Sequence, residues 1–412
     1  MLKKCCLALA LLVAGLTPSA GQTEHQFIGF RLNDGARQSS FSFDYINNLI
    51  IIPVVMNDSI KLNFILDTGV RTTLITNNEP GNLELRFTRQ VQVAGLGIAH
   101  DIKAFVVPDV KLQLPGITGH GQTLIVLGED YLKLQNHLGK EVHGILGYDF
   151  FNHFVVRINY ASKRITVFAP DQFKPSRRYS PVDLVIKGGR PYAHARIVQT
   201  NGTVAEGMFL IDTGASHSLL LETDRKTDVY LPIPHIPAII GYGLGGEVSG
   251  NLARIERLDW GGFAIKRVIA SYGSGLYVSS ADSAIGRIGS IGGEIISRFT
   301  AIFDYKNQKL YLRPNNVFRK PFDYNMSSMD IVAGGKDFKT FTVVNVNRNS
   351  AAWNAGVRPG DIVLSINELG AGELNLEQIN AIFRSNPGAV VHMLVRRDKQ
   401  VLSVKFRLKR LI

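Results

Sequence analysis

The sequence is nearly devoid of cysteine. Its only two cysteines, Cys5 and Cys6, stand at the very start of a chain of 412 residues. The rest of the chain therefore cannot use a disulfide, a cysteine nucleophile or a cysteine-ligated metal. Long hydrophobic runs are also missing beyond residue 16. No later run approaches the roughly 18 apolar residues of a membrane-spanning helix, so no transmembrane segment is expected.

Acidic residues are fewer than basic ones, 34 Asp and Glu against 46 Lys and Arg, and the formal net charge is +12. Such an excess can attract nucleic acid. Near the C-terminus, however, the basic residues Lys405, Arg407 and Lys409 alternate with apolar residues, which is typical of the solvent face of a strand. No nucleic-acid partner is expected, because the charge is spread over the chain.

Metal-binding patterns are absent from the sequence as well. The ten histidines form no HExxH motif, and His137, His143 and His153 are spaced 6 and 10 residues apart, which does not fit one face of a helix. Surface or packing roles suit these histidines better. No metal ion or other cofactor is expected.

The first 21 residues have the order of features of a secretory signal peptide. Lys3 and Lys4 precede an apolar stretch at residues 5–16, and small residues follow near Ala20 and Gly21. Cleavage there would remove both cysteines and two lysines, which lowers the formal charge from +12 to +10. The sequence thus predicts an exported protein, located in a periplasm, on an outer surface or secreted.

The chain contains an internal repeat. The segment FILDTG at residues 64–69 recurs as FLIDTG at residues 209–214, an offset of 145 residues. At the same offset, GILG at residues 144–147 recurs as GSIG at residues 289–292. We therefore expect two copies of one lobe of about 145 residues, followed by a different unit.

Each copy has the pattern of a β protein. Short runs rich in Ile, Val and Phe alternate with Gly, Asn, Asp and Pro turns, and strands are expected at residues 49–55, 105–107, 265–269 and 309–312. Short helices are expected after the second motif of each copy, at residues 148–153 and 294–299. Residues 169–181 have the composition of a linker between the copies.

The repeated Asp-Thr-Gly carries the chemistry. Asp67 and Asp212 each follow an apolar run that indicates a buried strand, where an uncompensated carboxylate costs several kcal/mol. The burial is compensated if the two strand ends meet on a pseudo-twofold axis and the two carboxyl groups share one proton. One carboxyl group then acts as acid and the other as base, and their titration belongs to the pair.

The residues after each aspartate support the same arrangement. Gly69 and Gly214 would let the two loops approach each other without Cβ clashes. The hydroxyls of Thr68 and Thr213 can reach across to the opposite loop. Such a site suits activation of one water for attack on an amide carbonyl.

These motifs and the duplicated lobe resemble the retropepsin-like aspartic peptidases, fused here into a single-chain pseudo-dimer. The resemblance covers residues 49–314 and implies two acid-protease-like β-barrel lobes, at residues 22–170 and 171–319. It also implies an endopeptidase that acts on peptide or protein substrates. Arg71 and Ser290 depart from the family pattern, and Arg71 near the dyad would lower the pKa of a carboxyl group.

The resemblance further implies β-hairpin flaps that close over the substrate. The candidates are glycine-rich segments around Gly95 and Gly97 and around Gly243 and Gly245, with Tyr242 as a substrate contact. Residues 241–246 also satisfy GxGxxG, the pattern of a dinucleotide site. A Rossmann turn must open a helix, whereas the residues that follow read as a strand, so the flap is favoured.

Residues 320–412 break the repeat. They contain the series S-x-A-x-x-A-G-V-x-P-G-D-I-V-L-S-I-N, and the segment at residues 338–408 resembles a bacterial PDZ domain, an α+β fold. PDZ domains bind peptide ends by strand addition beside a helix. The resemblance places such a groove between residues 341–346 and a helix from Leu376, with residues 336–340 as the carboxylate loop. The expected groove residues are Phe341, Thr342, Val343, Val344 and Ile379.

Three functional hypotheses follow. The first is an exported aspartic endopeptidase whose PDZ domain selects or holds substrate. The second is a non-catalytic peptide-binding or scaffold protein that retains the dyad. The third is a precursor or inhibited form in which the PDZ domain or residues 22–48 cover the cleft.

Overall fold

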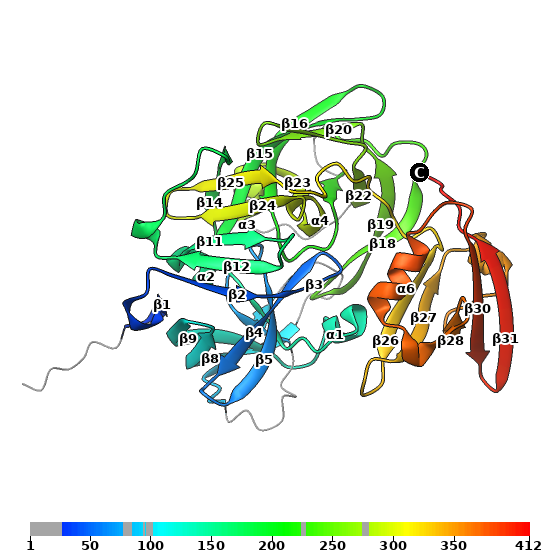
Figure 1. Ribbon diagram of the computed structural model, residues 1–412, viewed down its shortest axis with the longest axis horizontal. Coiled ribbons are helices and arrows are strands. Elements are labelled where there is room, and N and C mark those ends of the chain that lie inside the picture. Colours follow the sequence, from blue (N-terminus) through cyan, green and yellow to red (C-terminus); the bar gives the residue numbers. More distant parts are fainter. Residues whose placement is uncertain (1–26, 77–84, 94, 96–101, 224–227, 274–279) are drawn as a thin grey trace, which may run out of the picture.

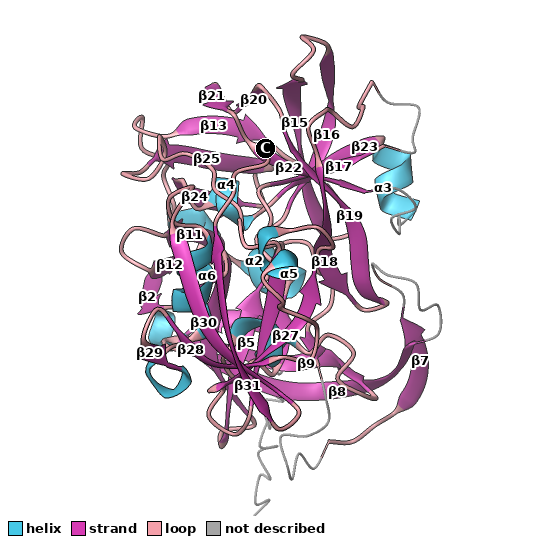
Figure 2. Cartoon of the chain, turned by 90° about the vertical axis from the view of Figure 1, so that its right-hand side faces the viewer, coloured by secondary structure: helices cyan, strands magenta, loops and turns pink. Residues whose placement is uncertain are grey.

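The computed structural model describes residues 27–76, 85–93, 95, 102–223, 228–273 and 280–412. Its strands form four sheets, and the few helices are short (Figures 1 and 2). The expectation of a mostly β protein with two similar regions and a different C-terminal unit is confirmed.

The first sheet belongs to the first copy of the repeat. In spatial order its strands are β1 (Gly29–Leu32), β9 (Ile117–Leu127), β6 (Leu74–Ile75), β10 (Gly144–Leu146), β5 (Ile60–Leu66), β4 (Leu49–Met56), β8 (Ile102–Leu114) and β7 (Arg89–Val93), with β3 (Asp44–Ile46) paired to β4. Strand β4 is almost entirely apolar, and all but two of its residues are buried because both of its faces are covered.

A corresponding sheet belongs to the second copy. Its strands are, in spatial order, β18 (Ile236–Gly243), β19 (Gly246–Arg254), β22 (Ile269–Gly273), β17 (Leu219–Glu222), β23 (Arg287–Ile291), β16 (Val204–Ile211), β15 (Arg190–Val198), β20 (Arg257–Trp260) and β21 (Phe263–Lys266), with β14 (Val185–Lys187) paired to β15. The central strands β5, β10 and β6 of the first sheet correspond to β16, β23 and β17 here, with the same parallel and antiparallel pairings.

A third sheet joins the two copies. It runs in the order β13 (Ser180–Asp183), β25 (Lys309–Pro314), β24 (Phe299–Asp304), β11 (Val155–Asn159), β12 (Arg164–Phe168) and β2 (Gln38–Ser42). Its middle pair, β11 and β24, brings one strand from each copy together in antiparallel register. Every residue of β24 is buried, so this sheet forms a core that holds the two copies in one fixed relation.

The helices of the described residues are α1 (Leu134–Leu138), α2 (Tyr148–His153), α3 (Ser280–Ile285), α4 (Gly293–Ile296), α5 (Ala351–Asn354) and α6 (Leu376–Phe383); single 3-10 turns occur at η1 (Asn33–Gly35), η2 (Pro170–Gln172) and η3 (Ala371–Glu373). The helix expected at residues 148–153 is confirmed as α2. The helix expected at residues 294–299 is shorter, because Phe299 already pairs in the shared sheet as the first residue of β24.

Two further expectations for single elements can be compared with the structure. The strand expected at residues 265–269 is divided between β21 and β22, since Arg267 has a positive φ of 52° and turns the chain there. Residues 169–181, expected as a linker, lie between β12 and β13 and contain only the 3-10 turn η2. Among the described residues, no helix is long and apolar enough to cross a membrane.

The C-terminal unit has its own sheet and helices. The strands run in the order β26 (Met329–Gly334), β27 (Thr340–Val346), β28 (Ile362–Ile366), β30 (Val390–Arg397) and β31 (Gln400–Arg407), with β29 (Leu369–Gly370) paired to β28. The helix α6 packs beside this sheet (Figure 1). Asn375 caps α6 by accepting a hydrogen bond from the backbone N–H of Gln378, and Gln378 reciprocates with its side chain.

Candidate active site

Each aspartate of the repeated motif follows the end of a central strand. Asp67 comes directly after β5, and its backbone N–H donates to the carbonyl of Leu146 on β10 at 2.9 Å. Asp212 comes directly after β16 and donates in the same way to Ile291 on β23, also at 2.9 Å. The second glycine motif of each copy therefore forms the parallel strand beside the aspartate, which explains why the two motifs share one spacing.

The two threonines lock the aspartate loops together. The hydroxyl of Thr68 donates to the carbonyl of Ile211 at 2.6 Å, and that of Thr213 donates to the carbonyl of Leu66 at 2.9 Å. Each hydroxyl also accepts from the backbone N–H of the opposite threonine, at 3.0 and 3.1 Å. Both side chains are fully buried. This reciprocal network confirms the expected crossing of the threonines between the loops.

The two glycines allow the loops to approach closely. A Cβ atom on Gly69 would lie 2.9 Å from the carboxyl of Asp212, and one on Gly214 would lie 2.0 Å from the Cγ atom of Asp67. Any side chain at either position would collide with the opposite carboxyl group. Each glycine also donates its backbone N–H to the aspartate two residues before it, at 2.6 Å for Gly69 and 3.0 Å for Gly214.

The two carboxyl groups share one environment. Burial raises the pKa of Asp67 well above its usual value, and the charge of Asp212 raises it further. Burial also raises the pKa of Asp212, whereas a hydrogen bond from Asp67 and the positive charges of Arg287 and Arg190 act to lower it. The two carboxyl groups therefore titrate as one pair, in steps that belong to the pair and not to either residue.

The positive charges near Asp212 belong to a cluster that the sequence analysis missed. Arg287 lies 3.1 Å from Asp282 and 3.3 Å from Glu222, and Arg190 lies 3.2 Å from Asp282. Tyr192 donates its hydroxyl to Asp282 at 2.9 Å. These residues come from different strands and from α3, so no short motif contains them.

The repeat carried no signal for these arginines. At the repeat offset of 145 residues, the first copy has Tyr45 and Val142 in the places of Arg190 and Arg287. The charge of the exposed Arg71 acts to lower the pKa of Asp149, and its expected effect on Asp67 or Asp212 stays a prediction.

The dyad lies at a cavity of about 550 Å³ between the two copies. Both aspartates, both glycines of the motifs and the hairpin of β18 and β19 line it. In this hairpin Gly243 pairs with Gly246, which has a positive φ of 99° and closes the turn through Leu244 and Gly245. Residues 246–254 form a strand, so the dinucleotide-site alternative is wrong and the hairpin has the position of a flap.

The candidate flap of the first copy is described only in part. Gly95 lines the cavity, and a Cβ atom at this position would come within 2.9 Å of Leu244 at the tip of the other hairpin. Gly97 lies outside the described residues. Tyr242 lines the cavity, and its ring stacks on His137 of α1 at 3.8 Å between centroids. The expected packing role of His137 is confirmed by this contact.

His217 and Ser290 form a pair at the cavity wall. The Nε2 atom of His217 lies 3.0 Å from the hydroxyl of Ser290. Both residues line the cavity next to Asp212. The serine that departs from the family pattern thus has a hydrogen-bond partner in this histidine.

The peptide groove expected in the C-terminal unit was assigned to the wrong strand. The sheet holds β27 between β26 and β28, so residues 341–346 offer no open edge for strand addition. Phe341, Val343 and Ile379 are fully buried in the core, and Thr342 pairs on both sides. Of the expected groove residues, only Val344 is exposed, at 41%. Of residues 336–340, the expected carboxylate loop, residues 336–339 lie in the turn between β26 and β27, and Thr340 begins β27. The edge strand beside α6 is β26.

Comparison with protein families agrees with this architecture. A family model described as aspartyl protease matches residues 52–150 and 195–291, and a PDZ domain model matches residues 342–397. None of the curated proteins compared matches the chain. The fold and the paired aspartates define a protein of the aspartic protease type. The chain consists of two retropepsin-like aspartyl protease segments followed by a C-terminal PDZ domain.

Proposed function

We propose that the protein is an endopeptidase that hydrolyses peptide bonds with a water activated by Asp67 and Asp212. The observation that carries this proposal is the mutual contact of the two Asp-Thr-Gly loops, in which each glycine faces the carboxyl group of the opposite copy. A buried carboxyl pair is costly for the fold. Its presence at the wall of a large cavity is the arrangement that acid–base catalysis requires.

In this proposal the two carboxyl groups have different tasks, and the positive charges of Arg287 and Arg190 that act on Asp212 support its role as the ionised member. Asp212, the ionised member, accepts a proton from the attacking water, while the protonated Asp67 donates a hydrogen bond to the carbonyl oxygen of the scissile amide. The amide carbon then becomes tetrahedral. Proton transfer to the amide nitrogen releases the amine product, and no covalent bond forms between the enzyme and the substrate. The hairpin with Tyr242 and Leu244 lies over the same cavity and would limit the entry of further water.

We also propose that the protein acts outside the cytoplasm. The support for export is residues 1–21, with their two lysines, apolar stretch and small residues. Mass determination of the mature N-terminus tests this part, with cleavage expected near Ala20 or Gly21. An intact Met1 in protein recovered from its native compartment would contradict it.

The catalytic proposal is tested by Asp67→Asn and Asp212→Asn in the full chain. Each variant is expected to lose hydrolysis of a mixed peptide library by at least about 10³-fold across pH 3 to 8, since either change removes the acid–base pair. The matched control is Asp149→Asn, which alters a partly buried carboxyl group outside the cavity and should keep activity. A thermal unfolding measurement on each variant checks that it is folded.

Two outcomes would reject the catalytic proposal. Hydrolysis that survives either substitution at the dyad would assign the chemistry elsewhere. Tight binding of extended peptides without cleavage at any pH would instead support a peptide-binding scaffold that retains the dyad.

A further inference from the structure

The edge of the PDZ sheet beside α6, strand β26, borders two different parts of the molecule. Strand β26 lies at the end of the sheet, and near its C-terminal end the carbonyl of Ala333 accepts a hydrogen bond from the side chain of Asn136 on α1, at 2.9 Å. A Cβ atom on Gly139, just after α1, would lie 3.1 Å from Leu376 at the start of α6. One end of the space between β26 and α6 is thus covered by the first copy of the repeat.

The rest of this edge faces the dyad. Asp330, Ile331 and Val332 of β26 line the same cavity of about 550 Å³ as Asp67 and Asp212. In Figure 1, β26 and α6 lie on the side of the molecule where β18 and α1 approach the C-terminal unit. The PDZ domain is therefore a wall of the candidate substrate cleft.

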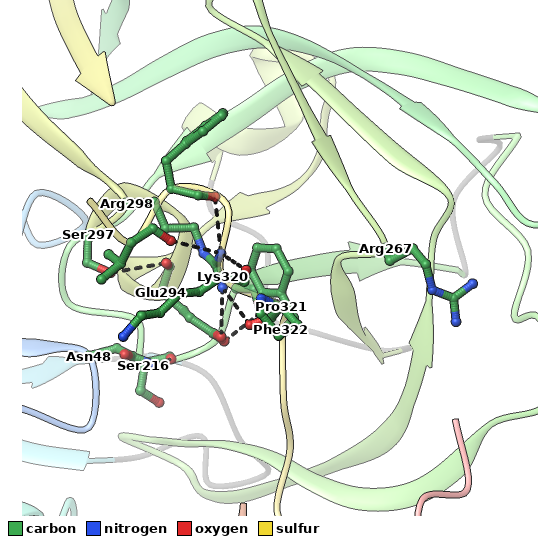
Figure 3. Close-up of polar contacts among 12 residues, drawn as sticks. Asn48, Ser216, Arg267, Glu294, Ser297, Arg298, Lys320, Pro321 and Phe322 are labelled. Carbon is green, nitrogen blue, oxygen red and sulfur yellow. Dashed lines mark hydrogen bonds and ion pairs between the residues drawn. The ribbon is translucent and has the colours of Figure 1, made fainter. Parts of the chain in front are cut away.

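The position of this wall is fixed by a buried arginine. The guanidinium group of Arg298 donates to the carbonyls of Val317, Phe318, Lys320 and Pro321 in the segment that leads into the PDZ domain (Figure 3). It also stacks on the ring of Phe322 at 3.5 Å and lies 3.8 Å from Glu294. These contacts fix the segment before the PDZ domain and therefore restrict movement of the domain away from the cleft.

The cavity wall formed by α6 carries an exposed cation, Arg384. Among the described residues, no hydrogen bond or ion pair joins its guanidinium group to another side chain. The carboxylate on which its charge acts, that of Glu294, already accepts from Ser218 at 2.7 Å and pairs with Arg298. The acids on the other walls are also engaged: Asp330 accepts from Asn345 at 3.0 Å, and Asp282 binds the arginines near the dyad.

We propose that one extended peptide occupies the catalytic cleft and the uncovered part of β26 together, and that Arg384 binds a carboxylate of this peptide. The inference rests on the proposed function for its substrate, and it adds a specificity-determining residue that no aspartic protease motif contains. Edge strands pair with extended peptides through their main chains. A guanidinium group with unused donors matches a carboxylate, from either a peptide C-terminus or a Glu or Asp side chain.

The test measures binding and hydrolysis separately. Labelled peptides of about ten residues are titrated into the full-length Asp67→Asn variant, with and without Arg384→Gln. The peptides carry a free or an amidated C-terminus, and Glu or Gln at one internal position. Loss of affinity by about 10-fold on Arg384→Gln, restricted to peptides with a carboxylate, is the expected result. The group of peptides whose affinity falls, those with a free C-terminus or those with an internal Glu, identifies the source of the carboxylate. Arg396→Gln, an exposed arginine on β30 away from the cavity, should change nothing.

The outcomes separate this inference from the proposed function. Equal affinity of all peptides for both variants, or an equal loss for all of them, would overturn the role of Arg384 even if the wild-type chain hydrolyses peptides. A loss specific to carboxylate peptides, combined with no hydrolysis by the wild-type chain, would reject the catalytic proposal and leave the binding site supported.

Discussion

The ring of Tyr242 on the β18–β19 hairpin stacks on the imidazole ring of His137 on α1, with 3.8 Å between the ring centroids. The neighbour of His137, Asn136, binds the edge of β26. A single short helix of the first copy thus contacts the hairpin of the second copy and the PDZ domain. Helix α1, the hairpin and the PDZ domain all line or border one cavity, so substitutions in α1 should affect substrate entry.

Acid should weaken the contact between His137 and Tyr242. Burial lowers the pKa of His137 from 6.5 to about 4, and the charge of Lys133 acts in the same direction. The neutral ring is therefore the form that stacks, so the contact is complete above pH 6.5 and is lost as the pH falls through 4. Hydrogen exchange of the β18 amides, corrected for intrinsic rates, is expected to rise over this range. In His137→Phe, which keeps an aromatic ring without a charge, the rise should be absent; an unchanged rise would contradict the prediction.

The charge of Arg190 should influence the pH range in which hydrolysis is fastest. Arg190→Gln removes one of the positive charges that lower the pKa of Asp212, so both limbs of the bell-shaped profile should move to higher pH. The profile of kcat/KM against pH measures this. Arg196→Gln changes an arginine at the other end of the same strand and should leave the profile in place. A shift to lower pH, or equal shifts in both variants, would contradict the assignment.

The dyad should reduce the stability of the fold at neutral pH. Because the pKa of Asp67 is raised in the folded chain, its contribution to stability is present below its unfolded value of about 3.8 and is lost as the pH rises through the folded pKa. Asp67→Asn should therefore raise Tm at pH 7 by about 2–4 °C for each ~1 kcal/mol gained. The gain should vanish near pH 3, and a Tm that falls at pH 7 would refute this account.

The buried hydroxyl of Thr213 should stabilise the junction of the two copies. Thr213→Val keeps the shape of the side chain but leaves the N–H of Thr68 and the carbonyl of Leu66 without their partner. The expected loss is about 2–4 kcal/mol in the free energy of unfolding, measured with denaturant. Thr213→Ser keeps the hydroxyl and should lose much less. Equal stability of the two variants would show that the hydrogen bonds contribute little.

The segment before the PDZ domain should depend on Arg298. Replacing this residue with methionine removes the donors to the carbonyls of residues 317, 318, 320 and 321 and leaves the half-buried Glu294 without this ion pair. Cleavage by trypsin after Arg319 is expected to accelerate by about 10-fold or more, because local opening becomes easier. Lys306→Met, at an exposed ion pair with Asp171, is the matched control. No acceleration would mean that other contacts hold the segment.

Much of the fold and the centre of the candidate site could be predicted from the sequence. The repeat of Asp-Thr-Gly and of the glycine motif is local and strictly spaced, so it identified Asp67 and Asp212 and the loops that join them. The alternation of apolar and polar residues predicted the strands, because each strand face is either buried or solvated. Helix boundaries were less certain, as at α4, where pairing of Phe299 in the shared sheet ends the helix early.

Only the tertiary structure decided what surrounds the dyad. Arg190 and Arg287 act on Asp212 from strands that are far apart in the chain, and Asp282 binds both arginines, so this cluster has no local signature. The order of strands in the PDZ sheet likewise made β26, and not β27, the edge strand beside α6, since edge position depends on long-range pairing and not on composition. The sequence by itself determined the chemistry of the paired aspartates, while the packing of the three units decided which side chains face the cavity that they share.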